Sequence, residues 1–226
     1  MNLRWTLAAT AMLAAGAAVA QDTNSEKGKL SYAIGYQIGS DFVERKMDVD
    51  VNTIIKAVQD GYAKRTPTVP EDQMRDVLGK FQQKMMTEAK ADFDKLAGDN
   101  KAKSQKFMSE NKGKKGITTL PSGVQYRVIE DGAGARPNAN SEVTVHYRGS
   151  LTSGLEFDSS FARGEPVHFK VNSVIKGWQE VLPLMSTGAH WQIFVPAELA
   201  YGDRGQPPRI GPNEALVFEI KLIEVK

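Results

Sequence analysis

A large aromatic ring and a carboxylate stand side by side at Phe157 and Asp158, shortly after a segment whose residues alternate as a β-strand does. In that segment Val143, Val145 and Tyr147 alternate with polar residues, so the tyrosine is expected to point inward with the valines. The tyrosine, the ring and the carboxylate would then meet near one end of a sheet. An aromatic wall with a single carboxylate indicates a recognition pocket more than a reactive centre.

Other residues that resemble catalytic or cofactor-binding motifs lack the spacing or the companion residues that such sites require. His146, His168 and His190 fall on the solvent-facing side of predicted strands and are not spaced like metal ligands, so no metal site is expected. The stretch Ser173–Lys176 matches the S-x-x-K of acyl-enzymes, but the companion K-T-G and S-D-N motifs are absent. Gly132–Gly134 lacks the third glycine and the flanking elements of a dinucleotide site. We therefore expect no cofactor.

A set of aromatic and aliphatic residues remains, and it gathers at predicted strand ends and loop starts. Any one of them alone is best explained as hydrophobic core. Together they indicate a pocket, because Val174–Trp178 opens a short helix and Ala200–Gly202 opens a loop rich in glycine and proline. Such positions at the mouth of a sheet commonly bind ligands. The set is Tyr147, Phe157, Val174, Ile175, Trp178, Tyr201 and Phe218, with Asp158 as the single charge.

The second half of the chain supplies the strands that would position this set. After Gly116 the apolar residues recur at every second position, and one short amphipathic helix interrupts them at 177–185. This pattern predicts an antiparallel sheet wrapped round one helix. The strand segments are 124–129, 143–147, 167–171, 191–195 and 216–222.

The first half is predicted to be helical. Apolar residues recur every four positions over 26–45, where Gly35 and Gly39 weaken the helix unless another backbone comes close. A second short helix fits 52–64, with Asp50 or Asn52 as its N-cap. The apolar stripes of these helices need more partners than about forty residues can provide, so the segment is expected to dimerise.

A third helix is predicted to start around Pro70, with Glu71 placed to complete a capping box. If it runs on to Asn111, it would span roughly 60 Å. Beyond Gly98, a hinge or merely a weak spot, large apolar residues are scarce, so that half is expected to be a solvated rod or a loosened linker. The basic run Lys112–Gly116 is predicted to be a solvated helix end.

Composition limits the classes of function. The chain has 226 residues, of which 29 are basic and 27 acidic, and this balance argues against a nucleic-acid surface. Its length and 41% hydrophobic content allow one ordinary core plus a smaller second unit. Cysteine is absent, so neither disulfides nor a lipid-modified cysteine is available.

The first twenty residues are predicted to be a signal peptide. Arg4 gives a positive start, Leu7–Ala15 an apolar stretch, and Ala18–Ala20 the small residues that a signal peptidase cleaves. The stretch is short for a membrane anchor and lacks a stop-transfer flank. We therefore expect an exported protein whose mature chain begins at Gln21.

Several motifs together resemble a known family. Residues 116–226 are similar to FKBP-type peptidyl-prolyl cis-trans isomerases, and the helical half resembles the dimerisation arm of their macrophage infectivity potentiator subgroup. The resemblance implies V-shaped homodimers of bacterial envelopes, joined through the N-terminal helices. Its motifs are Val145–Gly149, Phe157–Ser160, Val174–Trp178, Leu199–Gly202 and Leu216–Phe218, and for the subgroup Leu30–Gly35, Met74–Leu78, Asn100–Lys103 and Ile210–Asn213.

The resemblance also implies roles for single residues. It makes Asp158, Tyr201 and Tyr147 the catalytic group of a proline pocket with Trp178 as its floor, and it places the backbone N–H of Ile175 on a substrate carbonyl. Proline-containing polypeptides and macrolides such as rapamycin are the implied ligands. The implied substrate-binding residues are Phe157, Val167, Val174, Ile175, Trp178, Ile210 and Phe218.

This chain departs from the commonest family pattern at two places that bear on substrate preference. Val167 stands where many members have a second pocket phenylalanine, and Gln206–Arg209 stands where many have His-Pro-Gly. Both changes affect the breadth of the pocket.

We therefore expect an α+β protein in four segments. These are a signal peptide at 1–20, a helical dimerisation domain at 21–69, a long connecting helix at 70–115 and an isomerase domain at 116–226. The expected function is rotation of X–Pro bonds during the folding of exported proteins, in the periplasm or at the outer-membrane surface of a Gram-negative bacterium. The alternative is a dimeric chaperone or surface adhesin whose client binding does not depend on turnover, and Met74, Met85 and Met86 favour it.

Overall fold

A computed structural model describes residues 22–226, so the predicted signal peptide lies outside the described residues. The chain divides after Arg75 into two compact units. Among the described residues, no helix combines the length and the apolar character needed to cross a membrane.

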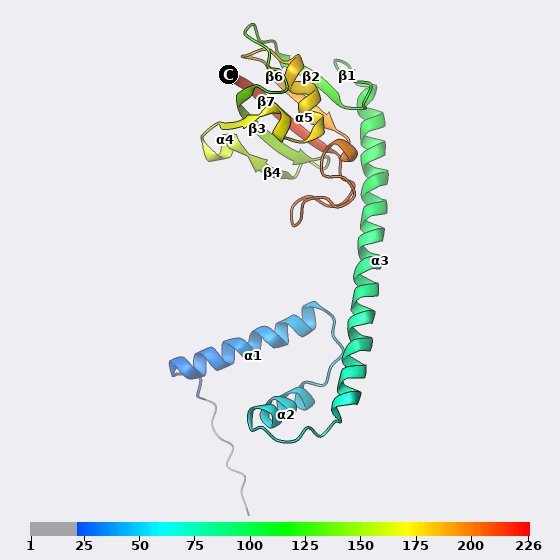
Figure 1. Cartoon of the computed structure of the whole chain (residues 1–226), viewed down its shortest axis with the longest axis vertical. Helices are drawn as coiled ribbons and strands as arrows, with labels where there is room; N and C mark the ends of the chain where they lie inside the picture. The colour runs from blue at the N-terminus through cyan, green and yellow to red at the C-terminus, as the bar shows by residue number, and fades with distance from the viewer. Residues whose placement is uncertain (1–21) are drawn as a thin grey trace, which may run out of the picture. The chain divides into compact units, whose positions relative to one another are not determined.

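The N-terminal unit contains the helices α1, Glu26–Glu44, and α2, Val51–Tyr62 (Figure 1). Ser25 caps α1 by accepting the backbone N–H of Gly28, and Asp50 caps α2 by accepting the N–H of Thr53. Both predicted helices are confirmed to within two residues at each end, and Asp50 rather than Asn52 is the cap.

Helix α3 runs without interruption from Glu71 to Lys112, so Gly98 does not break it. The helix starts one residue after Pro70. The expectation of a solvated second half is wrong, because Asn100, Ser104 and Asn111 are buried in that half. A count of apolar residues does not detect the face of α3 that is buried here, because hydrogen-bonding side chains form much of that face.

The second unit is built on an antiparallel sheet in the order β1-β2-β6-β7-β3-β4, with β5 paired to β3 (Figure 1). The long strand β3 is paired with β4, β5 and β7, and so holds the sheet together. The strands are β1 Thr118–Thr119, β2 Gln125–Glu130, β3 Glu142–Leu151, β4 Glu156–Ser159, β5 Val167–Lys170, β6 His190–Val195 and β7 Leu216–Val225.

The inward residues of the sheet close round helix α5, Lys176–Val181, which contributes Trp178 and Val181 to the core. The helix lies so close to β6 that a Cβ on Gly177 would stand 2.4 Å from a methyl of Val195. This confirms the predicted sheet wrapped round a helix. The remaining helical pieces are α4 Ser160–Arg163, η1 Val171–Ser173, η2 Leu182–Leu184 and η3 Ala197–Leu199.

Candidate active site

Four aromatic rings from different elements meet at one end of the core, and we call them the aromatic cup: Tyr147 of β3, Phe157 of β4, Trp178 of α5 and Phe218 of β7. The Trp178 ring packs edge to face against Tyr147 at 5.5 Å and against Phe218 at 5.2 Å between centroids. Phe157 meets Phe218 in the same way at 5.8 Å. Edge-to-face pairs at these separations are the favourable geometry for aromatic rings, so the cup is a rigid apolar surface.

Gly149 of β3 makes room for two of these rings. It is the register partner of both Asp158 on β4 and Phe218 on β7. A Cβ at this position would lie 2.7 Å from the Phe157 ring and 2.9 Å from the Phe218 ring. The close approach of the two rings to the backbone of β3 therefore requires a glycine at this position.

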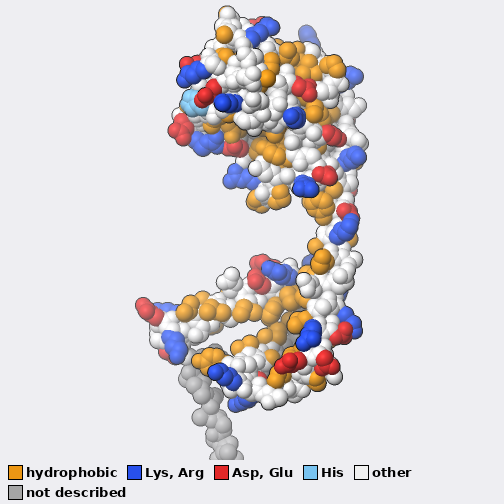
Figure 2. Space-filling view, in the orientation of Figure 1, with side chains coloured by type: hydrophobic (Ala, Val, Ile, Leu, Met, Phe, Trp, Pro, Cys, Tyr) orange, Lys and Arg blue, Asp and Glu red, His pale blue; other side chains and the backbone are white. Residues whose placement is uncertain are grey.

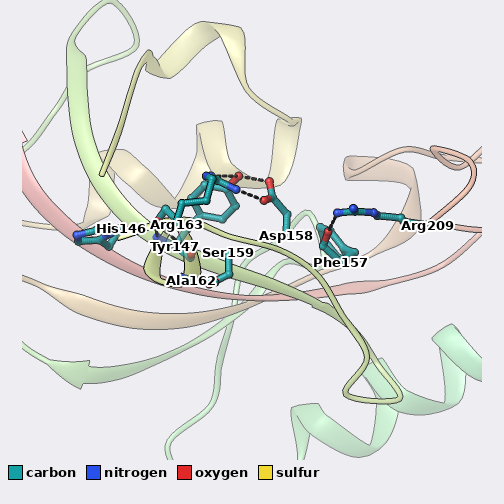
Figure 3. Close-up of polar contacts among 9 residues, drawn as sticks. His146, Tyr147, Phe157, Asp158, Ser159, Ala162, Arg163 and Arg209 are labelled. Atoms are coloured by element: carbon teal, nitrogen blue, oxygen red, sulfur yellow. Dashed lines mark hydrogen bonds and ion pairs between the residues drawn. The ribbon is translucent and has the colours of Figure 1, made fainter. Parts of the chain in front are cut away.

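Asp158 forms the polar edge of the cup. One carboxylate oxygen accepts a hydrogen bond from the hydroxyl of Tyr147, and the other accepts one from the guanidinium of Arg163 on α4 (Figure 3). Burial by itself raises the pKa of Asp158, but the hydrogen bonds from Tyr147 and Arg163 outweigh it and hold the pKa below its usual value. The carboxylate is therefore ionised and fixed in place at neutral pH.

The two tyrosines near Asp158 are held in their neutral form. Burial raises the pKa of Tyr147, and the hydrogen bond to Asp158 raises it further. Burial also raises the pKa of Tyr201, with a second contribution from the negative charge of Asp158. Both hydroxyls therefore remain protonated at neutral pH. No hydrogen bond within residues 22–226 uses the Tyr201 hydroxyl, so it is available to donate to a ligand.

Trp178 is 5% exposed, and its indole N–H has no hydrogen-bond partner among residues 22–226. A buried donor without an acceptor costs free energy and usually has a functional or structural explanation. The cup surrounds the indole with rings rather than polar groups. The floor of the site is therefore dry and apolar.

Every predicted site residue except Asp158 belongs to the core of this unit or packs against it. Trp178, Ile210 and Phe218 are buried in the core, and Asp158 lies at its polar edge. The N–H of Ile175 makes no backbone hydrogen bond within the described chain and stands just before α5. The partly buried members packed against the core are Tyr147, Phe157, Val167, Val174, Ile175 and Tyr201.

Sequence reasoning missed two arginines. Arg163 binds Asp158 and also reaches the hydroxyl of Tyr147 at 3.4 Å. Arg209 donates to the backbone carbonyl of Phe157 at 2.5 Å and so joins the loop after Tyr201 to strand β4 (Figure 3). The sequence hints only at Arg163, which follows Asp158 by five positions and ends the short helix α4.

The three histidines lie apart from one another. His146 bonds Ser160, His168 bonds Thr144, and His190 bonds Glu219. Among residues 22–226 no cluster of three or more histidine, cysteine or acidic side chains is placed to hold a metal ion.

Comparison with known proteins covers both units. Residues 134–223 match the family described as FKBP-type peptidyl-prolyl cis-trans isomerase, and residues 27–128 match the domain amino terminal to it. The chain is 46% identical to "Outer membrane protein MIP" of Legionella longbeachae, covering 92% of this chain and 89% of that protein. It is 41% identical to "Peptidyl-prolyl cis-trans isomerase Mip" of Coxiella burnetii, covering 95% and 94% of the two chains.

A solved structure supports the same relationship. The crystal structure of FkpA from Escherichia coli matches with a TM-score of 0.70 and 33% identity, over 90% of this chain and 98% of that chain.

Proposed function

Because this chain belongs to the FKBP-type peptidyl-prolyl cis-trans isomerases, in the Mip-like group with an amino-terminal helical domain, we propose that the aromatic cup is where it rotates X–Pro bonds. The protein is an isomerase that assists protein folding, and its substrates are proline-containing polypeptides. The observation that carries the assignment is the meeting of four rings with one ionised carboxylate at their edge.

The cup acts on the resonance that keeps the amide planar. Rotation about a peptide bond meets a barrier of ~20 kcal/mol, because the planar form has partial double-bond character. The planar form is also the more dipolar one, so it loses stabilisation when it leaves water for an apolar surface. The rings grip the pyrrolidine while the preceding carbonyl turns, and binding energy therefore favours the twisted geometry.

The polar groups act electrostatically and transfer no proton. The N–H of Ile175 and the hydroxyl of Tyr201 hold substrate carbonyls, and the fixed charge of Asp158 lies beside the twisting amide. Tyr147 and Arg163 keep that carboxylate in position. Neither tyrosine gives up its proton near neutral pH, since both pKa values are raised.

A short X–Pro peptide assay with and without rapamycin tests this assignment. Rapamycin is expected to occupy the cup and suppress turnover. Turnover that persists when rapamycin is bound at one equivalent would place the reaction elsewhere.

We also propose that the N-terminal unit pairs with a second copy of the chain. Leu30, Ile34 and Ile38 lie on one side of α1 and are 63%, 52% and 46% exposed, and Figure 2 shows hydrophobic side chains in a row along this helix. None of residues 22–226 comes within 4 Å of a Cβ built on Gly35 or Gly39, so a second backbone could approach there. Sizing of the Ile34→Glu variant against a control, Lys27→Glu on the same helix, tests the pairing. A dimer that survives Ile34→Glu would contradict it.

The predicted signal peptide supports export, and one relative bears the name "Outer membrane protein MIP". We propose that the protein works in the bacterial envelope. Fractionation of cells into cytoplasm, periplasm and outer membrane tests this location, and recovery in the cytoplasm would contradict it.

The exposed apolar faces of α1 and α2 also fit a second candidate activity, in which they bind unfolded clients. Suppression of aggregation that survives Asp158→Ala and is lost in Ile34→Glu would assign client binding to the helical unit. Loss in Asp158→Ala alone would assign it to the cup.

A further inference from the structure

A group of hydrogen bonds joins the second half of α3 to the end of the loop that follows Tyr201. We call this group the seam. Asn100 donates from its side-chain amide to the carbonyl of Pro212 at 3.0 Å. Ser104 donates to the carbonyl of Asn213 at 2.8 Å and accepts the N–H of Ala215 at 2.8 Å. Both helix side chains therefore bind backbone, not other side chains.

One hydrogen bond of the seam runs in the opposite direction, from the loop to the helix. Asn213 donates from its side-chain amide to the carbonyl of Ala97 at 3.2 Å. Its backbone has φ of 57°, a left-handed conformation that asparagine adopts more readily than most residues. The conformation and the side-chain bond together fix the loop against the helix.

The seam is buried. Asn100 is 6% exposed and Ser104 is 8% exposed, in a helix whose other polar side chains mostly face solvent. A buried polar group left without its partner loses free energy, because water cannot replace the lost bond. Burial of these bonds therefore holds the loop firmly against the helix.

The same loop carries two residues of the proposed site. Ile210 precedes Asn213 by three positions and is buried in the core beside the cup. The N–H of Asn213 donates to the carbonyl of Gly202 at 2.9 Å, directly next to Tyr201. A Cβ built on Gly211 would stand 2.8 Å from the amide nitrogen of Asn100, so the helix touches the loop right after Ile210.

The other walls of the cup are held differently. Tyr147, Phe157 and Phe218 are fixed by the pairing of β3, β4 and β7, and Trp178 by α5. A change in the seam should therefore move one wall of the site and leave the others in place.

A separate contact keeps α3 docked when the seam is altered. Asn111 donates to the side-chain carbonyl of Gln125 at 2.9 Å, and Gln125 donates to the carbonyl of Met108 at 2.8 Å. Phe107 also packs on Phe194 with ring centroids 6.0 Å apart. Seam substitutions are therefore not expected to release the helix.

We propose that Asn100 and Ser104 are positioning residues of the isomerase site: by holding the loop from Gly202 to Ala215, the long helix sets the places of Tyr201 and Ile210. This inference rests on the proposed function, since it assumes that Tyr201 and Ile210 line the substrate site. In these terms the second half of α3 is part of the catalytic unit and not only a connection.

The test uses the full-length mature chain and the variants Asn100→Ala, Ser104→Ala and Asn213→Gly. The last keeps the left-handed backbone and removes only the side-chain bond. Because each lost hydrogen bond contributes on the order of 1 kcal/mol, Asn100→Ala and Asn213→Gly, which lose one bond each, are expected to lower kcat/KM on a short X–Pro peptide about fivefold, and Ser104→Ala, which loses two bonds, is expected to lower it further. Matched controls on exposed positions of the same helix, Ser109→Ala and Lys103→Ala, should leave kcat/KM unchanged.

Two further measurements distinguish positioning from general destabilisation. NMR resonances of Ile210 and Tyr201 should shift in the seam variants, while those of Phe157 and Trp178 stay in place. Ser104→Thr should restore activity, because it keeps the hydroxyl and the cavity of about 100 Å³ beside Ser104 has room for a methyl group. Unchanged kcat/KM in all three seam variants would overturn the inference, and so would shifts spread equally over the four reporters.

The variant Asp158→Ala is measured in the same assay as a reference. If Asp158→Ala is fully active, the proposed site fails. If Asp158→Ala is impaired and the seam variants match the parent, only the positioning role fails.

Discussion

Replacing Asp158 by alanine separates its proposed catalytic role from its structural one. The change removes the acceptor for Tyr147 and for Arg163 at once. The side chains of Arg163 and Asp158 are 43% and 38% exposed, so solvent screens their ion pair and its loss changes stability little. The half-buried hydroxyl of Tyr147 loses its partner at a further cost of about 1 kcal/mol. We therefore expect a total destabilisation of about 1 kcal/mol.

The expected effect on turnover is larger. Removal of a fixed group that stabilises the charge distribution of a transition state typically costs a factor of about 100 to 1,000 in a fully enclosed site. Asp158 is partly exposed, so we expect a fall in kcat/KM of about 10- to 100-fold. The fall is measured on a short X–Pro peptide, and stability is measured by urea unfolding of the same preparations.

Arg163→Ala is the matched comparison. It removes the same ion pair but keeps the carboxylate and its hydrogen bond to Tyr147. Arg163→Ala should therefore lose less stability than Asp158→Ala, and its kcat/KM should fall by less than that of Asp158→Ala. Equal kcat/KM for Asp158→Ala and the parent would refute the electrostatic role. Equal losses for both variants would assign the effect to the ion pair instead of the carboxylate.

Three further predictions concern the same site. Tyr201→Phe should lower kcat/KM several-fold and leave urea stability nearly unchanged, because no residue in 22–226 forms a hydrogen bond with that hydroxyl; a matching loss of stability would contradict this. Gly149→Ala should destabilise the domain by about 1 to 3 kcal/mol in urea unfolding, because its methyl would meet the Phe157 ring. The pKa of Asp158 is lowered from 3.8, so its stability contribution should be fully present above pH 5 and lost as pH falls through the folded pKa. The difference in unfolding free energy between the parent and Asp158→Asn, followed from pH 7 to pH 3, checks this, and a difference independent of pH would contradict it.

The strands and the aromatic cup were predictable because each depends on a local pattern. Phe218 and Tyr147 lie on alternating strands, and Trp178 opens a short amphipathic helix, so their inward direction follows from sequence period alone. The strand order and the pairing of Gly149 with both Asp158 and Phe218 do not follow from it. Those depend on which strands meet in the folded chain.

The polar contacts were not predictable for a related reason. Arg163, Arg209, Asn100 and Ser104 belong to residue types that usually face water, and nothing in their local sequence distinguishes them from solvated neighbours. Their partners include Pro212 and Asn213, which lie more than a hundred positions from Asn100 and Ser104. Asn100 and Ser104 are polar and buried at the same time, and a pattern of apolar residues overlooks such positions.

Helix α3 passes through Gly98 without a break, and within residues 22–226 nothing stands within 4 Å of a Cβ built there. A glycine inside a helix weakens it by about 1 kcal/mol relative to alanine, so the helix is least stable at its two glycines, Gly79 and Gly98. Gly98 lies just before Asn100, the first side chain that grips the loop. The bond from Asn213 to the carbonyl of Ala97 lies before Gly98, and the bonds of Asn100 and Ser104 lie after it, so the seam spans this weak point and supports the helix on both sides of it.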